Sequence, residues 1–135
     1  MAQVHLGYFE NFKSNDTLLM EGDTEGLRHL ARVLRSLERG SADAIEIHGL
    51  PFVERHHGVR LTAKRAPHDL VARVDASSNE FTWERTDVGW QDAADKVEVL
   101  VECAEGHHYL EATEDQVVVE VSKGEYGSDW WIRNG

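Results

Sequence analysis

The sequence predicts a single α+β domain over residues 1–135, in which an antiparallel sheet packs against two helices on one face. Two long segments carry apolar residues at helical spacing, and several short segments alternate apolar and polar residues. The order strand, strand, helix, strand, strand occurs once in residues 1–65 and again in 66–135. With 41% hydrophobic and 29% charged residues, the composition is that of a globular protein able to bury a core.

The first half opens with two predicted strands, residues 3–9 and 15–22, followed by a helix over residues 23–40. The helix is predicted from an apolar stripe that comprises Leu27, Leu30, Ala31, Leu34 and Leu37. Asp23 is the expected N-cap and Gly40 the expected residue after the helix end. Residues 44–49 alternate as a strand, residues 50–58 with Pro51 are a loop, and residues 59–65 are the next strand.

The second half repeats this order. Residues 69–75 and 80–86 are predicted strands, and residues 87–106 are a helix capped by Asp87 and ended by Gly106. Its apolar stripe comprises Trp90, Ala93, Ala94, Val97, Leu100, Val101 and Ala104. Residues 107–113 and 115–124 are the last two strands, joined through Glu114 and Asp115.

The two halves also match in register. Gly26 and Leu27 correspond to Gly89 and Trp90 at an offset of 63 residues, and Ile47 corresponds to Leu110 at the same offset. One interpretation is an internally duplicated β-β-α-β-β plan. The other is that an α+β chain shows this order twice by chance. In both cases each one-sided helix needs a sheet face to cover its apolar stripe.

Charge is distributed unevenly along the chain. The formal net charge is -11, and residues 66–135 hold 16 acids against 5 bases, whereas residues 1–65 are balanced. This excess argues against nucleic acid as a direct partner, because phosphate contacts need lysine and arginine. Cys103 is the single cysteine, the start of the chain does not resemble a signal peptide, and no apolar run reaches membrane-spanning length. We therefore expect a cytoplasmic protein without a membrane partner.

The helices carry two charged stripes, one basic and one acidic. On a helical wheel the first has Arg28, Arg32, Arg35 and Arg39 on one side, and the second has Asp95, Glu98, Glu102 and Glu105. The stripes either pair as solvated faces of neighbouring helices or leave the acidic residues free to bind a basic protein partner.

Two adjacent tryptophans, Trp130 and Trp131, close an otherwise hydrophilic tail. In an extended segment they would point to opposite sides. One interpretation is that Trp130 or Trp131 closes an open end of the core. The other is that the outward one serves as an interface anchor, a role in which tryptophan is enriched. Together with the acidic stripe they are the predicted protein-binding residues.

The search for catalytic, cofactor and metal sites identifies none. His48 with His56 and His57, His107 with His108, and His5 with His29 are the histidine groups considered, but none has the spacing of a zinc motif. Cys103, near the end of the predicted second helix, is expected to be a small buried apolar residue and not a nucleophile. His48 and Glu46 share one face of a strand, which suits proton chemistry and a surface hydrogen bond equally.

Residues 17–48 combine a Gly-Asp turn, a Glu-Gly-Leu helix start, a leucine-striped helix and a strand carrying His48. This stretch resembles the small α+β immunity proteins of bacterial polymorphic toxin systems. The resemblance implies a non-enzymatic protein that binds and blocks a cognate toxin.

Three functional hypotheses follow from the sequence. The first is an acidic protein-binding module, such as an immunity-type inhibitor. The second is a structural or regulatory protein, including a homodimer, without a catalytic role. The third is a small histidine-based metal protein or enzyme.

Overall fold

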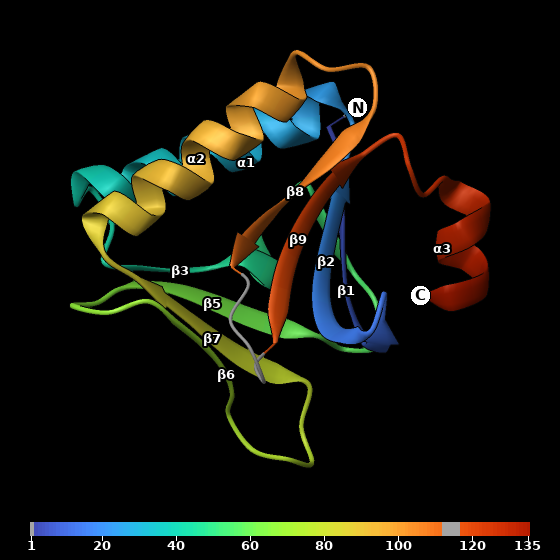
Figure 1. Cartoon of the computed structure of the whole chain (residues 1–135), viewed down its shortest axis with the longest axis horizontal. Helices are drawn as coiled ribbons and strands as arrows, with labels where there is room; N and C mark the ends of the chain where they lie inside the picture. Colours follow the sequence, from blue (N-terminus) through green and yellow to red (C-terminus); the bar gives the residue numbers. More distant parts are fainter. Residues whose placement is uncertain (1, 112–116) are drawn as a thin grey trace.

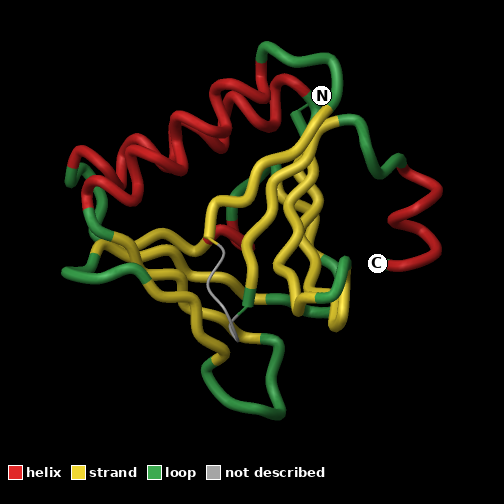
Figure 2. Tube along the Cα trace, viewed as in Figure 1, coloured by secondary structure: helices red, strands yellow, loops and turns green. Residues whose placement is uncertain are grey.

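The computed structural model describes residues 2–111 and 117–135, and it confirms a mixed α+β protein. Figures 1 and 2 show two sheets with a pair of helices across them and a short helix at the C-terminal end. The elements are β1 (Val4–Phe12), β2 (Asn15–Gly22), α1 (Thr24–Arg39), β3 (Ala44–Glu46), the 3-10 turn η1 (Ile47–Gly49), β4 (Val53–Arg55), β5 (Arg60–Arg65), β6 (Leu70–Arg73), β7 (Glu80–Arg85), α2 (Asp87–Val101), β8 (Gly106–Glu111), β9 (Val118–Lys123) and α3 (Ser128–Asn134).

The strands form two mixed sheets, so the prediction of an antiparallel sheet is wrong. Sheet A has the order β4-β1-β2-β9-β8, and sheet B has the order β3-β5-β7-β6. The pairs β2–β9, β5–β7 and β1–β4 are parallel, and the remaining pairs are antiparallel. The parallel pairs at the sheet centres arise because each half's first hairpin pairs with a strand from the other half.

The first helix begins and ends where the sequence predicts. The Asp23 carboxylate accepts a hydrogen bond from the Gly26 amide at 2.6 Å, which satisfies one of the free amides of the first turn. Gly40 follows the helix with a φ of 77°, a left-handed conformation that glycine adopts without strain.

The second helix differs from the prediction at both ends. Its cap is Thr86, whose hydroxyl accepts from the Gly89 amide at 3.1 Å, so Asp87 is the first helical residue and not the cap. The helix ends at Val101, five residues before Gly106. The side chains that face the sheets are buried in both helices, and α1 and α2 lie side by side across the sheets (Figure 1).

The core lies between the two sheets and the helix pair. Trp83 from β7 and Trp90 from α2 meet edge to face, with ring centroids 4.7 Å apart. The Trp90 indole N–H donates to the Lys64 carbonyl at 3.1 Å, so burial leaves this polar group satisfied. Leucines from α1 and aliphatic residues from β1, β2, β5 and β9 complete the core.

Several local expectations are corrected. Residues 44–49 divide into β3 and η1, and the predicted loop 50–58 contains β4, which pairs with β1. The tail after β9 forms α3, where an extended segment was expected. Residues 112 and 113 of the predicted strand 107–113, and the predicted connection through Glu114 and Asp115, lie outside the described residues. Within the described chain, no helix has the length and apolar character needed to cross a membrane.

The shared sheets lead to a prediction about fragments. We expect residues 1–65 and 66–135, made as separate peptides and studied at low concentration, to lack a cooperative unfolding transition, because each sheet loses its central partner strand. An equimolar mixture is expected to regain the circular dichroism spectrum and the transition of the intact chain. A cooperative transition in either fragment alone would contradict this view of the fold.

Candidate functional site

The acidic residues Asp95 and Glu98 face the basic side of α1. Arg35 reaches both carboxylates through Nη2 at 2.5 Å, and its Nη1 contacts Glu38 at 2.8 Å. Hydrogen bonds to these carboxylates raise the pKa of Arg35, and the largest effect comes from Glu98, followed by Glu38 and Asp95. The two charged stripes therefore meet at Arg35, and this part of the acidic stripe is already paired.

Glu102 and Glu105 lie in a different position from the first two acids. Glu102 is the C-cap of α2 and Glu105 lies in the turn before β8, so the four acids do not share one helical stripe as predicted. Both side chains are exposed, and within residues 2–111 and 117–135 neither makes an ion pair. They form the part of the acidic surface that is free to attract a cation.

A groove runs beside these acids between α1 and α2. It has a volume of about 390 Å³ and is lined by Arg28, Ala31, Arg32, Glu98, Val101 and Glu102. The α1 wall is basic and the α2 wall is acidic. The nearby Lys123 does not form an ion pair with the acidic wall, because its ammonium is buried and donates to the carbonyls of Val101 and Cys103.

The two adjacent tryptophans occupy different environments in α3. Trp131 is 2% exposed, whereas Trp130 is half-buried. Trp131 packs on the outer face of sheet A, where its ring stacks on His5 at 4.9 Å and on His56 at 4.7 Å between centroids. Trp130 packs edge-on against Phe9 at 5.2 Å. One tryptophan is therefore buried as expected, but against the outside of a sheet and not at the end of the core.

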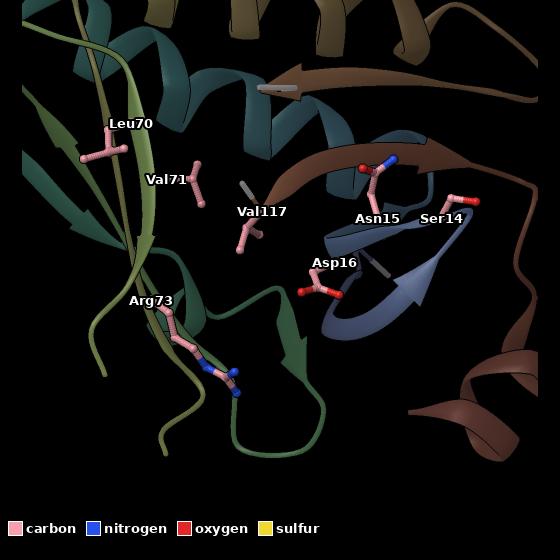
Figure 3. A pocket seen from close by; sticks show the side chains of 7 residues that line it. All are labelled: Ser14, Asn15, Asp16, Leu70, Val71, Arg73 and Val117. Atoms are coloured by element: carbon pink, nitrogen blue, oxygen red, sulfur yellow. The ribbon is translucent and has the colours of Figure 1, made fainter. Parts of the chain in front are cut away.

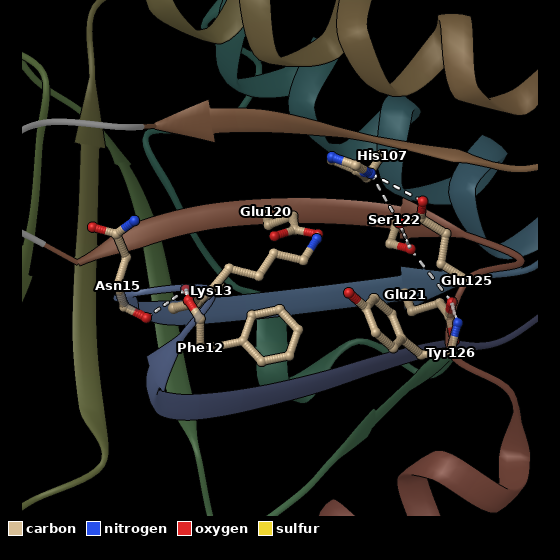
Figure 4. Close-up of polar contacts among 10 residues, drawn as sticks. Phe12, Lys13, Asn15, Glu21, His107, Glu120, Ser122, Glu125 and Tyr126 are labelled. Carbon is tan, nitrogen blue, oxygen red and sulfur yellow. Dashed lines mark hydrogen bonds and ion pairs between the residues drawn. The ribbon is translucent and has the colours of Figure 1, made fainter.

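A buried carboxylate holds this tail in place. Glu21, on the outer face of β2, accepts hydrogen bonds from the Trp131 indole N–H at 3.1 Å and from the Tyr126 amide at 2.5 Å. The Ser122 hydroxyl donates to the same carboxylate at 3.4 Å, and Figure 4 shows Glu21 with Ser122 and Tyr126 around it. Burial raises the pKa of Glu21, and its hydrogen-bond donors offset this effect only in part.

A second buried carboxylate lies on the same face. Glu120 in β9 is fully buried, and its Oε2 pairs with the Lys13 ammonium at 3.1 Å. Burial disfavours the Lys13 cation, but hydrogen bonds with Tyr126 and Glu120 outweigh burial and raise the pKa of Lys13. The Lys13 ammonium also lies near the rings of Phe12, at 5.5 Å, and Tyr126, at 5.7 Å (Figure 4).

The structure groups the histidines differently from the three clusters considered in the sequence analysis. His48 accepts from the Leu61 amide at 3.0 Å and its other nitrogen lies 3.0 Å from Glu46, which fixes it as a structural hydrogen-bonding residue. His5 meets His56, at 3.0 Å between Nδ1 and Nε2, and not His29. Burial, followed by the nearby His5, lowers the pKa of His56, although Glu54 opposes this effect.

His107 lies 2.9 Å from Glu125 on the outer face of sheet A. Cys103 follows α2 and is half-buried, with its thiol directed to the Val99 carbonyl at 3.3 Å.

A cavity of about 490 Å³ lies between the β1–β2 hairpin and β6 (Figure 3). Arg73 and Asp16 are its charged lining residues. Arg73 is held by the Ser78 carbonyl at 2.6 Å and the Asn79 amide oxygen at 3.0 Å, and Asp16 accepts from the Asn11 amide at 3.0 Å. Because both charges are engaged, the described lining does not present an acid–base pair for chemistry.

Comparison with known proteins gives no relative. No family model matches the chain, and no curated protein or solved structure matches it significantly.

The positions of the tryptophans predict unequal effects on stability. Trp131→Ala is expected to lower the free energy of unfolding by about 3–5 kcal/mol, because it empties a buried site and removes a partner of Glu21. Trp130→Ala, at a half-exposed position, is expected to cost about 1 kcal/mol. Urea denaturation of the two variants measures the difference. Equal losses would show that Trp130 is as important to the fold as Trp131.

The raised pKa of Glu21 predicts a pH dependence of stability. A carboxyl whose pKa is higher in the folded state than in the unfolded state binds a proton on folding, so its contribution to stability falls as pH rises through the folded pKa. We expect this slope in the wild-type protein, above the usual glutamate range, and not in Glu21→Gln. Urea denaturation of both proteins between pH 4 and pH 8 tests it, and identical slopes would contradict it.

Proposed function

We propose that this chain is a non-enzymatic protein-binding module whose acidic second half engages a basic partner. The observation that carries the proposal is the position of Glu102 and Glu105, which are exposed and make no ion pair within the described chain. Acidic surfaces of this kind raise the rate at which a cationic partner associates.

Two of the few basic residues in the second half of the chain are buried. Residues 66–135 contain only five lysines and arginines, of which Arg85 is 8% exposed and Lys123 is 9% exposed. Arg85 lies among Asp69, Asp92 and Glu111, and Lys123 donates to backbone carbonyls. Arg85 therefore pairs with acids of its own half, and Lys123 is held at the carbonyls that end α2, so neither side chain reaches the solvent beside Glu102 and Glu105.

The groove between α1 and α2 supports a binding orientation. A cationic side chain of a partner is attracted to Glu98 and Glu102 and repelled by Arg28 and Arg32 on the opposite wall. This difference favours a partner that lies over the C-terminal end of α2. Trp130, half-exposed on the tail, is proposed as an additional anchor.

The partner class that we propose is a basic toxin. The resemblance of residues 17–48 to immunity proteins supports an inhibitor, and an acidic inhibitor presents to a nuclease the charge that its nucleic acid would present. A homodimer without another partner is the alternative, and it is an outcome of the experiment below.

We also propose that residues 1–65 and 66–135 are copies of one ancestral unit. In this view β1, β2, β3 and β5 of the first half correspond to β6, β7, β8 and β9 of the second. Replacing each strand by its counterpart turns the order β1-β2-β9-β8 of sheet A into β6-β7-β5-β3, which is the order of sheet B, and the central pair is parallel in both sheets. The helix caps agree with the offset of 63 residues, since Asp23 accepts from Gly26 and Thr86 from Gly89. Dimerisation of one half at high concentration, measured by sedimentation, would support the proposal, and a strictly monomeric half would count against it.

Charge reversal tests the binding surface. The partner captured by the wild-type protein from its own cells is identified by mass spectrometry, purified, and titrated by calorimetry at low and high salt. We expect affinity to fall with salt and to fall at least about tenfold in Glu102→Lys/Glu105→Lys, because two attractive charges become repulsive.

The control variant is Glu10→Lys/Glu80→Lys, which makes the same change in net charge at two exposed glutamates of β1 and β7. It is expected to bind close to wild type. An affinity that does not change with salt, or an equal loss in both double variants, would reject the proposed surface. Capture of the chain's own copies alone would favour the homodimer.

A further inference from the structure

A second feature, on the opposite edge of sheet A from β8, is independent of the acidic surface. His5 in β1 and Glu54 in β4 are directly paired residues of two parallel strands. His56 follows Glu54 by two residues and therefore points to the same face, and its amide donates to the Leu6 carbonyl at 2.9 Å. The pairing of β1 with β4 thus brings three metal-ligating side chains together on the outer face of the sheet.

The potential ligand atoms of these side chains converge. His5 Nδ1 lies 3.0 Å from Glu54 Oε2 and 3.0 Å from His56 Nε2, and the last two atoms are 3.9 Å apart. If one proton lies between these three atoms, the lone pair of at least one of them still faces another acceptor atom. A cation at their centre would satisfy all three atoms at once.

We propose that His5 Nδ1, His56 Nε2 and Glu54 Oε2 bind a divalent transition-metal ion, with Zn²⁺ as the best fit. Imidazole and carboxylate ligands suit zinc, and metal–ligand bonds of about 2.0–2.1 Å in a tetrahedron separate neighbouring ligand atoms by about 3.3 Å. The distances of 3.0, 3.0 and 3.9 Å lie on both sides of this value. Two neutral imidazoles and one carboxylate leave a bound Zn²⁺ with a net charge of +1.

The surroundings hold the ligands in place. Trp131 stacks on both imidazole rings, and the two histidine side chains are 16% exposed. Gln3 donates from Nε2 to Glu54 Oε2 at 3.1 Å, which is the kind of outer contact that orients a metal-binding carboxylate. A cavity of about 350 Å³ adjoins the three side chains, so a fourth position is open to water or a small ligand.

A second histidine–carboxylate group provides a natural comparison. His107, Glu120 and Glu125 also bring their ligand atoms together. However, Glu120 already pairs with the Lys13 ammonium at 3.1 Å, and this fixed positive charge opposes a metal ion. His107 is therefore a matched control for His56.

Zinc binding is tested on the full chain. The protein is stripped with a chelator, titrated with Zn²⁺ by calorimetry, and its metal content is measured after washing. We expect one Zn²⁺ per chain, at least about tenfold weaker binding in His56→Ala and in Glu54→Gln, and wild-type binding in His107→Ala. Glu54→Gln retains the shape of a half-exposed side chain, so it tests the site even where His56→Ala does not fold, as judged by circular dichroism.

Trp131 provides an independent readout. Because its ring lies within 5 Å of both imidazole centroids, binding of the paramagnetic ion Ni²⁺ is expected to quench tryptophan fluorescence in the wild type, and Glu54→Gln is expected to need a higher Ni²⁺ concentration for the same quenching. Washed wild-type protein that holds well below one equivalent of Zn²⁺ would overturn the proposal. So would wild-type affinity in Glu54→Gln, or loss of binding in His107→Ala but not in His56→Ala.

Discussion

The backbone pairing between the two halves of the chain is the constraint on which the rest of the structure depends. At the centre of each sheet a strand from residues 1–65 lies parallel to a strand from residues 66–135, as β2 with β9 and β5 with β7. Each hairpin is completed by a strand of the other half: paired residues lie 101 positions apart in β2 and β9, and 20 positions apart in β5 and β7. The helix pair, the core and the outer face of sheet A all form only when these pairings are made, so folding of the two halves is coupled.

The outer face of sheet A shows what this coupling produces. Glu21 on β2 lies opposite Ser122 on β9, and both bury polar groups at a place where strands normally present exposed side chains. Buried polar groups are costly unless they are hydrogen-bonded. The tail supplies the missing donors from Tyr126 and Trp131, so the C-terminal helix is fixed by specific hydrogen bonds as well as by apolar contact.

The two proposed activities use separate parts of this framework. The acidic surface lies at the C-terminal end of α2, next to the edge strand β8. The proposed metal site of His5, Glu54 and His56 lies at the opposite edge, on β1, on β4 and directly after β4. Trp131 connects this site to the tail, because its ring stacks on His5 and His56 and its indole N–H donates to Glu21. Order in the tail and order at His5 and His56 are therefore physically linked, and the same helix α3 carries Trp130, the proposed additional anchor of the acidic surface.

Local signals in the sequence determined the α+β class, the leucine-striped helix with its Asp23 cap and Gly40 end, the two-part order of elements and the uneven charge. These features follow from periodicity, capping chemistry and composition, which act over a few residues. Tertiary structure alone decided the parallel pairing, the formation of β4 in a segment with a proline, and the helical tail. It also decided that His5 meets His56 and that Trp131 packs outside the core. These outcomes depend on which distant strands share backbone hydrogen bonds, and the local pattern of side chains does not encode that choice.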